Sequence, residues 1–286
     1  METISYLIHK IHDCGKGAAV LVVILMALST RAFAFYPPIP LTDVQAAVQS
    51  EGSYSKVCCT VFDPGTGSWQ SGCSAPEYRV AGLTTNQGIV AWKETNITQY
   101  SAVCFSIYDV TKKTWIHGRS GWEREMSLSS NDGIVAWIET NIQNYSRVCF
   151  AVYDPARGNW QQGAGAWERR MSLQNEDGIV TWVETNIDNY SRVSFAIYEP
   201  AQTSWQISSG GSERSIGACS GDGVVAWRET NIYNQSRIFY AVYDPMRCVW
   251  QVGEGGSCGS CTVSMSISNA TLTYKDLPAR EWVSNP

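Results

Sequence analysis

Short runs of alternating hydrophobic and polar residues recur along most of the chain, and turn-forming residues separate them. In the copy that begins at Arg169, the runs read RRMSLQN, GIVTW, RVSFAIYEP and TSWQ. Alternation with a period of two is typical of half-buried β-strands, while Asp-Gly and Glu-Pro between the runs indicate tight turns. Each copy therefore predicts four short antiparallel strands.

The pattern repeats every 45 residues, as three glycine or tryptophan positions show. The glycine that opens the second run is Gly88, Gly133, Gly178 and Gly223, and the tryptophan that ends it is Trp92, Trp137, Trp182 and Trp227. The tryptophan of the fourth run is Trp115, Trp160, Trp205 and Trp250. Four strands in about 45 residues is the size of a β-propeller blade. Such a thin sheet cannot bury both faces alone, so successive copies are expected to stack.

The strand count predicts an all-β, five-bladed β-propeller of four-stranded antiparallel blades. First strands are expected near residues 79–84, 124–129, 169–174, 214–219 and 261–267. The chain opens with third and fourth strands and closes with first and second strands, so the N- and C-terminal strands are predicted to share one blade and remove a free edge. Residues 44–49 resemble an extra second strand that competes with residues 271–275. A six-bladed ring, or a fragment of a longer protein, is therefore the alternative.

The first 34 residues are predicted to be a signal peptide, followed by a single propeller domain of residues 35–286 with repeats over about 50–275. A basic stretch with Lys10 and Lys16 precedes an apolar run of residues 18–28, and residues 32–34 read Ala-Phe-Ala, a signal-peptidase pattern. The apolar run is too short to span a bilayer comfortably; an uncleaved anchor is the alternative. The expected location is secreted, periplasmic or at the cell surface, with no membrane contact beyond the signal peptide.

Charge and histidine content narrow the classes of function. The net charge of −5 is mild and the basic residues are scattered, so no nucleic-acid partner is expected. His117 is the single histidine of the expected mature chain, which argues against a Ser-His-Asp triad or a histidine-built metal site. The first strands offer small and apolar residues in place of the two carboxylates of a glycosidase; Glu125 is the nearest. We expect no catalytic residues, no metal and no cofactor.

Two kinds of loop are expected on one face, because an antiparallel meander sends alternate loops to opposite ends of its strands. One is ETNIxNYS, between the second and third strands; the other is the connector from the fourth strand to the next copy, such as GAGAWER. Candidate ligand-binding residues on the connectors are Trp122, Glu123, Arg124, Trp167, Glu168, Arg169, Glu213 and Arg214. Those on the loops are Glu139, Asn141, Tyr145, Glu184, Asn186 and Tyr190. Aromatic rings beside carboxylates, amides and guanidinium groups suit a sugar, and repeated weak sites gain strength through multivalency.

Packing alone would also make these residues recur, so a structural interpretation stays open for both loops. Asn and Thr serve equally well as turn residues that bond nearby backbone. The glutamates are placed to pair across the hairpin, as Glu139–Arg147, Glu184–Arg192 and Glu229–Arg237. On the opposite face, the aspartates of the Asp-Gly and Asp-Pro turns lack the oxygen spacing of a calcium loop and are expected to be turn residues. Cys58, Cys104 and Cys149 share one repeat position that Phe239 takes in a later copy, so they are predicted to be core residues.

The arrangement resembles the five-bladed tachylectin-2 type of lectin. The closest local match is Pro-Ala-Arg-Gly-Asn-Trp at 155–160 followed by Gly-Ala-Gly-Ala-Trp at 163–167, and the likeness is one of layout over about residues 50–275. The VAWxET pattern departs from that lectin, so its sugar specificity is not carried over. The chain is also similar to tandem propeller repeats of secreted bacterial proteins. The resemblance implies a secreted, non-enzymatic protein with multivalent carbohydrate binding, whose partners are glycans or a cell-surface protein. A protein-binding or adhesion scaffold is the alternative, and a glycosidase-like enzyme is less favoured.

Overall fold

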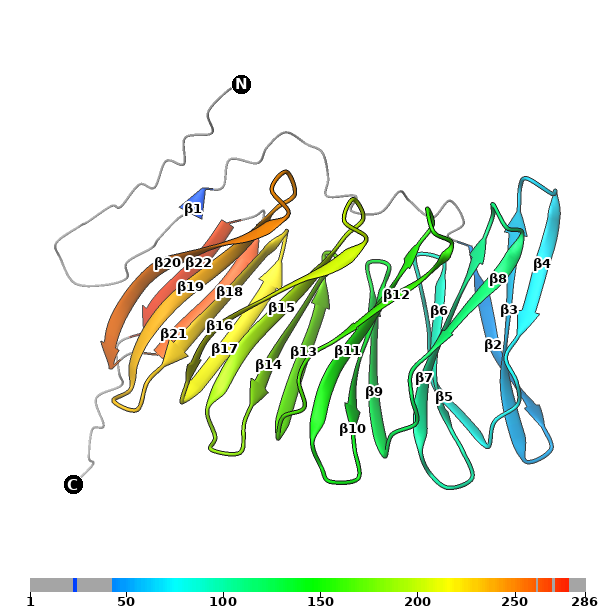
Figure 1. The fold of residues 1–286 in the computed structure, drawn as a ribbon, viewed down its shortest axis with the longest axis horizontal. Coiled ribbons are helices and arrows are strands. Elements are labelled where there is room, and N and C mark those ends of the chain that lie inside the picture. Colours follow the sequence, from blue (N-terminus) through cyan, green and yellow to red (C-terminus); the bar gives the residue numbers. More distant parts are fainter. Residues whose placement is uncertain (1–22, 25–42, 261, 269–270, 278–286) are drawn as a thin grey trace.

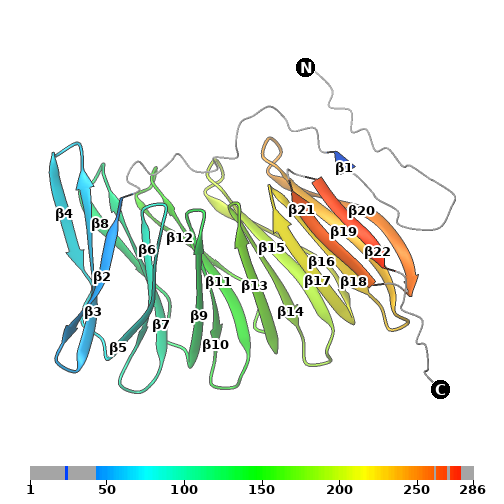
Figure 2. The ribbon, with the colours of Figure 1, turned by 180° about the vertical axis from the view of Figure 1, so that it is seen from behind.

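The computed structural model describes residues 23–24, 43–260, 262–268 and 271–277, and all its elements are β-strands. The sheets follow one another along a single row, from β4 at one end to β22 at the other (Figures 1 and 2). The predicted signal peptide lies outside the described residues except for Val23 and Ile24. The described part of the chain contains no helix of the length and hydrophobicity that a membrane span requires.

The strands fall into four repeating positions. First strands are β5 (Arg79–Asn86), β9 (Glu125–Asn131), β13 (Arg170–Glu176), β17 (Ser215–Gly221) and β21 (Thr262–Ser268). Second strands are β2 (Gln45–Glu51), β6 (Ile89–Thr95), β10 (Ile134–Thr140), β14 (Ile179–Thr185), β18 (Val224–Thr230) and β22 (Thr271–Leu277). Third strands are β3 (Tyr54–Asp63), β7 (Ser101–Asp109), β11 (Ser146–Asp154), β15 (Ser191–Glu199) and β19 (Gln235–Asp244). Fourth strands are β4 (Ser68–Cys73), β8 (Thr114–Arg119), β12 (Asn159–Ala164), β16 (Ser204–Glu213) and β20 (Val249–Ser260).

These strands confirm the predicted fold class, an all-β protein of four-stranded antiparallel blades in which five sets of first, third and fourth strands recur. The second sheet (β5–β8), third sheet (β9–β12), fourth sheet (β13–β16) and fifth sheet (β17–β20) each contain four strands in sequence order. Each strand pairs antiparallel with the next, as Trp137 opposite Cys149 illustrates. The alternating pattern and the Asp-Gly turns therefore specify each sheet locally.

The predicted sharing of one blade by the two chain ends is wrong. Strand β2, which covers the competing residues 45–49, pairs with β3 and completes the second-strand position of the first sheet (β2–β4). Strands β21 and β22 instead form the sixth sheet with the two-residue strand β1 (Val23–Ile24). The first and sixth sheets lie at opposite ends of the row (Figure 1). Local hairpin pairing of β2 with β3 takes the place that the C-terminal strands would need for closure.

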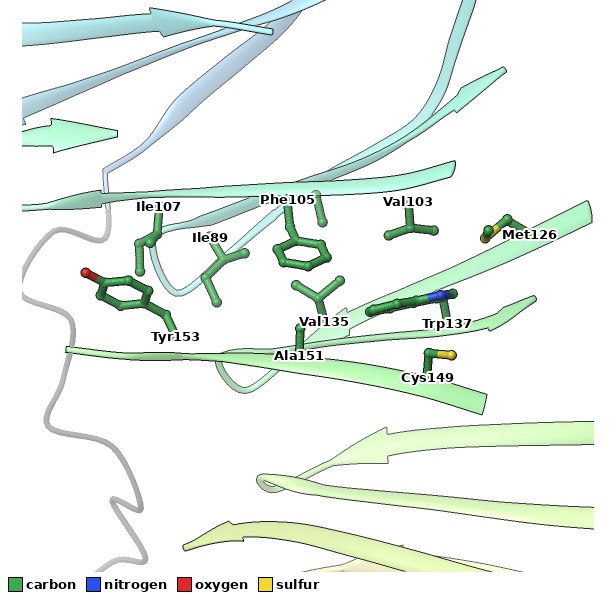
Figure 3. Packing of buried hydrophobic residues seen from close by; sticks show 11 residues of the cluster. Ile89, Val103, Phe105, Ile107, Met126, Val135, Trp137, Cys149, Ala151 and Tyr153 are labelled. Atoms are coloured by element: carbon green, nitrogen blue, oxygen red, sulfur yellow. The ribbon is translucent and has the colours of Figure 1, made fainter. Parts of the chain in front are cut away.

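The hydrophobic core consists of layers between neighbouring sheets. Between the second and third sheets, the Phe105 ring lies 5.8 Å from the Trp137 ring and 4.6 Å from the Trp160 ring. Figure 3 shows Phe105, Val135 and Trp137 within this layer. A Cβ atom at Gly118, opposite Phe105 on the adjacent strand, would meet that ring at 2.0 Å. The glycine of the fourth strand is therefore required for the aromatic packing of the layer.

The cysteine prediction is correct for two of its three residues. Cys104 and Cys149 are buried thiols of the core. Cys58 instead forms a disulfide with Cys73, which lies opposite it on β4. Among the described residues no sheet precedes the first one, so Cys58 lies on its outward face. The Cys258–Cys261 motif includes Cys261, which is outside the described residues.

Candidate functional site

The second-to-third-strand loops and the connectors lie together on one edge of the row, as predicted. Ser101 and Glu123 exchange two backbone hydrogen bonds of 2.7 and 2.9 Å, and Ser146 and Glu168 exchange two of 2.8 Å. The Arg124 guanidinium also donates to the side chain of Asn144 in the loop of the next sheet. We call this side the loop edge; it comprises loop residues 96–100, 141–145, 186–190 and 231–234 and connector residues 120–124, 165–169 and 211–214. Its loops form the lower side of Figure 1, along an open line.

The asparagines of the Glu-Thr-Asn motif serve the turn. Asn141 Oδ1 accepts hydrogen bonds from the backbone N–H of Gln143 (2.9 Å) and of Tyr145 (3.1 Å). Asn186 makes the same two bonds, to Asp188 and Tyr190. The structural interpretation is therefore confirmed for these two candidate residues, whose amide oxygens are occupied by their own loops.

The glutamates of the same motif are buried in charged pairs. Glu139 accepts a 3.3 Å hydrogen bond from the Trp137 indole and pairs with the Arg147 guanidinium. Glu184 likewise accepts from Trp182 at 3.2 Å and pairs with Arg192. The third predicted cross-hairpin pair, Glu229–Arg237, is also present at 3.7 Å. All three predicted pairs are confirmed, and the carboxylates of Glu139 and Glu184 lie beneath the surface.

The second sheet replaces the arginine but keeps its charge. Ala102 stands opposite Glu94, where the third, fourth and fifth sheets have arginine. Arg119, from the end of β8, reaches Glu94 Oε2 at 3.4 Å and takes over the pairing. Because a buried carboxylate without a cation is costly, the compensation indicates that the charged pair is part of the architecture of the second to fifth sheets.

The connector tryptophans cover these arginines. Trp122 lies 4.2 Å from the Arg119 guanidinium and Trp167 lies 4.6 Å from that of Arg147, both measured to the ring centroid. These are cation–π distances. Both indoles are half-buried, and Ser212 takes the tryptophan position in the next connector. Each of these connector tryptophans thus stacks on an arginine of the sheet that precedes the connector, and that arginine pairs with a buried glutamate.

Two of the connector glutamates, Glu123 and Glu213, lie near charged residues of the next sheet. Glu213 Oε1 lies 3.7 Å from Arg237, the partner of Glu229. Burial, and then the nearby Glu139 carboxylate, raise the pKa of Glu123, while Arg147 opposes the shift. Glu168 is half-buried and bonded to Ser146 through its backbone. The carboxylates of Glu123 and Glu213 therefore lie beside charged residues of the following sheet at the loop edge.

The exposed side chains of the loop edge include arginines, tyrosines and isoleucines. Arg124, Arg169 and Arg214 are exposed on the connectors, and Tyr145 and Tyr190 are exposed by 36 and 42% on the loops. Four isoleucines at the loop tips are exposed by 52 to 70%: Ile97, Ile142, Ile187 and Ile232. These isoleucines are not among the candidate residues predicted from the sequence, although an apolar residue at a fixed place within each polar turn was the available signal.

The opposite edge consists of turns that bond one another. Asp132 Oδ2 accepts the backbone N–H of Asp177 at 2.7 Å, and both residues have a positive φ. Asp154 Oδ1 accepts the backbone N–H of Ala156 at 3.0 Å. These contacts confirm the turn role predicted for the aspartates. Within the described ranges, no group of three or more His, Cys, Asp or Glu side chains is arranged to hold a metal ion.

Comparison with known proteins assigns no family. No protein-family model and no curated protein matches the chain. Among solved structures, the β-propeller domain of the Trilobed protease from Pyrococcus furiosus matches at 10% identity and a TM-score of 0.37, over 82% of this chain and 80% of that one. The uncharacterised protein lmo1340 from Listeria monocytogenes matches at 7% identity and a TM-score of 0.34, over 88 and 72%. The WD40 domain of SCAP from fission yeast matches at 5% identity and a TM-score of 0.29, over 84 and 75%. Likenesses this distant indicate nothing about a ligand.

Proposed function

We propose that the protein is a non-catalytic, multivalent binding module that contacts a protein partner through the tips of its loop edge. The observation that carries the proposal is the row of exposed isoleucines at Ile97, Ile142, Ile187 and Ile232. They recur at the same place in four sheets, although the packing between sheets does not use them. Exposed apolar residues that line one edge of a protein at regular spacing are suited to an interaction surface.

The chemistry around the isoleucines also favours a protein partner. Tyr145 and Tyr190 are exposed beside the isoleucine tips, and Arg169 and Arg214 are exposed on the adjacent connectors. Aromatic residues and arginine are enriched in protein interfaces. By contrast, the carboxylates and amides that a sugar would require are occupied internally, as the buried Glu139 shows.

The spacing of the tips supports multivalency. Packed sheets lie about 10 Å apart, so four equivalent tips in a row extend over about 30 Å. An extended segment of a partner can contact several tips at once, and linked weak contacts give an avidity that no single loop provides.

Carbohydrate binding is the second candidate, because the exposed Tyr145 and Tyr190 rings are suited to packing on sugars. The layout resemblance to tachylectin-2-type lectins points the same way. In this case the tyrosines, rather than the isoleucines, are the decisive contacts.

A peptide-display selection against the immobilised chain, run beside a glycan array, tests the proposal. We expect selected peptides to bind the wild-type chain and to lose binding when Ile142 and Ile187 are both changed to lysine. Ile207→Lys is the matched control, because Ile207 is a half-exposed isoleucine on β16 away from the loop edge. Failure to select any peptide, or equal binding by the double variant, contradicts the proposal. Glycan signals abolished by Tyr145→Ala and Tyr190→Ala support the second candidate instead.

A further inference from the structure

The first sheet exposes a face that the inner sheets bury. Phe62 on β3 and Trp69 on β4 stand opposite each other, with ring centroids 5.8 Å apart. They are exposed by 41 and 56%. The same two positions in the second to fifth sheets hold Tyr108–Trp115, Tyr153–Trp160, Tyr198–Trp205 and Tyr243–Trp250. Those tyrosines are buried and those tryptophans half-buried. The end of the row therefore presents an uncovered copy of a surface that is covered elsewhere.

In the inner layers, the third and fourth strands of the preceding sheet receive this aromatic pair. The Tyr153 hydroxyl donates to Asp109 at the end of β7, and the Trp160 indole donates to the Ile116 carbonyl of β8 at 3.1 Å. The Trp115 ring packs on Gly72 of β4, where a Cβ atom would meet it at 2.6 Å. A covering surface of this kind thus requires small residues beneath the tryptophan.

The far end of a second copy does not offer that surface. Among the described residues, the sixth sheet holds β21 and β22 in the first and second positions, together with the short β1. The two-residue β1 alone occupies its third position, and no described strand occupies its fourth, so the surface on which the inner aromatic pairs rest is incomplete there. Head-to-tail stacking of copies would therefore leave Phe62 and Trp69 without their usual support.

The outward face of the first sheet itself provides the small residues. Ala47 lies opposite Cys58, which in turn lies opposite Cys73, so a row of short side chains crosses the three strands on the same face as the aromatic pair. Thr60 and Ser71, also short, lie between this row and the Phe62–Trp69 pair. Phe62 also lacks the hydroxyl of its counterparts, so a partner needs no carboxylate at this point. An identical face therefore offers small residues beneath the tryptophan and needs no carboxylate opposite Phe62. In a twofold interface each residue contact between the two copies occurs twice, so both aromatic pairs are covered in the same way.

The charges at the rim are compatible with such a contact. Lys56 and Glu51 form an ion pair on the same face. The two side chains carry opposite charges, so the face has no excess of one sign to repel an identical copy.

We infer that the first sheet is a homodimer interface. Two copies pack their outward faces together about a twofold axis, and the Phe62–Trp69 pair of each copy lies on the row of short side chains of the other. The Cys58–Cys73 disulfide joins β3 and β4 within this face. The interface lies at the end of the row, so it leaves the loop edge free and does not depend on the proposed function.

Sedimentation equilibrium of the full chain over a wide concentration range tests the inference. We expect a monomer–dimer equilibrium that ends at two chains, and a dimer weakened about 30-fold or more by Trp69→Ala, as for a central interface tryptophan. Phe62→Ser is expected to act in the same direction. Ile187→Lys, on the loop edge, is the control and is expected to leave the equilibrium unchanged.

A measurement on the wild-type chain guards against variants that fail to fold. Hydroxyl-radical footprinting is expected to show Trp69 protected at high concentration and reactive at low concentration. A single-chain mass at every concentration, or a dimer that both substitutions leave intact, overturns the inference. Oligomers that keep growing with concentration overturn it as well, because they indicate head-to-tail stacking.

Discussion

The Tyr198 hydroxyl donates a 2.9 Å hydrogen bond to Asp154 Oδ2, which lies 44 residues earlier in the neighbouring sheet. Both side chains are buried. The other Asp154 oxygen accepts the backbone N–H of Ala156, so one carboxylate shapes a turn and links two sheets. The same inter-sheet bond recurs as Tyr108–Asp63, Tyr153–Asp109 and Tyr243–Glu199. In each such Tyr-Asp or Tyr-Glu dipeptide of an inner sheet, the tyrosine therefore bonds to the preceding sheet and the acidic residue to the following sheet.

Replacing Tyr198 by phenylalanine is expected to lower the free energy of unfolding by about 1.5–3 kcal/mol, the value of a hydrogen bond to a charged group. Urea denaturation followed by circular dichroism measures the change. Phe62→Tyr is the reverse substitution at the same position of the first sheet. No described sheet precedes this one to supply a carboxylate, so a change within about 0.5 kcal/mol is expected. Equal stability of wild type and Tyr198→Phe would show that the bond contributes nothing.

The same tyrosines predict a loss of stability in alkali. Burial, and then the hydrogen bond to a carboxylate, raise the pKa of Tyr153, Tyr198 and Tyr243 above the ordinary value of about 10. The folded chain therefore holds protons that the unfolded chain releases. This contribution is complete below about pH 10 and is lost as the pH rises further.

Urea midpoints measured between about pH 8 and pH 11 check this expectation, with tyrosinate absorbance recorded alongside. Tyr198→Phe is expected to reduce the slope, because it removes one of the shifted groups. The prediction fails if every tyrosine ionises near pH 10 while the circular dichroism remains native.

Removing the cation from a buried ion pair is expected to lower the free energy of unfolding by at least as much as the loss of the tyrosine hydrogen bond. Arg147→Ala leaves the buried Glu139 carboxylate without its partner, and we expect a loss of about 3 kcal/mol in the free energy of unfolding. Adding Glu139→Gln to this variant is expected to restore part of the loss, because a neutral amide needs no cation. Arg170→Ala, at an exposed position, is the control and is expected to change stability by less than about 0.5 kcal/mol. If Glu139→Gln lowered the stability of the Arg147→Ala variant further, the unpaired charge would not be the cause of the loss.

The core thiols are expected to resist alkylation in the folded chain. Burial raises the pKa of Cys59 to about 11, and burial followed by a neighbouring glutamate raises the pKa of Cys104 and Cys149. Because the thiolate is the reactive form, these residues should react with iodoacetamide only after denaturation. Cys248, half-buried in a turn, is expected to react first among the described free cysteines. Mass spectrometry after a short pulse measures the order, and native labelling of Cys149 as fast as Cys248 falsifies it.

The interactions within each hairpin were predictable because they are local. The Asn141 turn and the Glu139–Arg147 pair each join residues within one hairpin, where spacing alone brings them together. In the second sheet, Ala102 takes the position of the paired arginine and Arg119 pairs with Glu94 instead. This replacement was not predictable, because Arg119 comes from another strand of the sheet. Nor was the stacking of Trp167 on Arg147, which depends on the path of the connector.

By itself, the sequence determined the repeating four-stranded sheet, its register and its turns, since period-two alternation and Asp-Gly signals act over a few residues. Tertiary structure decided how the sheets are grouped: β2 pairs with β3, so β3 and β4 lie in another sheet than the C-terminal β21 and β22, and Phe62 and Trp69 remain uncovered. It also decided which polar residues face solvent, turning Glu139 inward and leaving Ile142 at the surface. The physical reason is that a local pattern specifies which residues share a strand face, whereas contacts between neighbouring sheets determine which of those faces become buried.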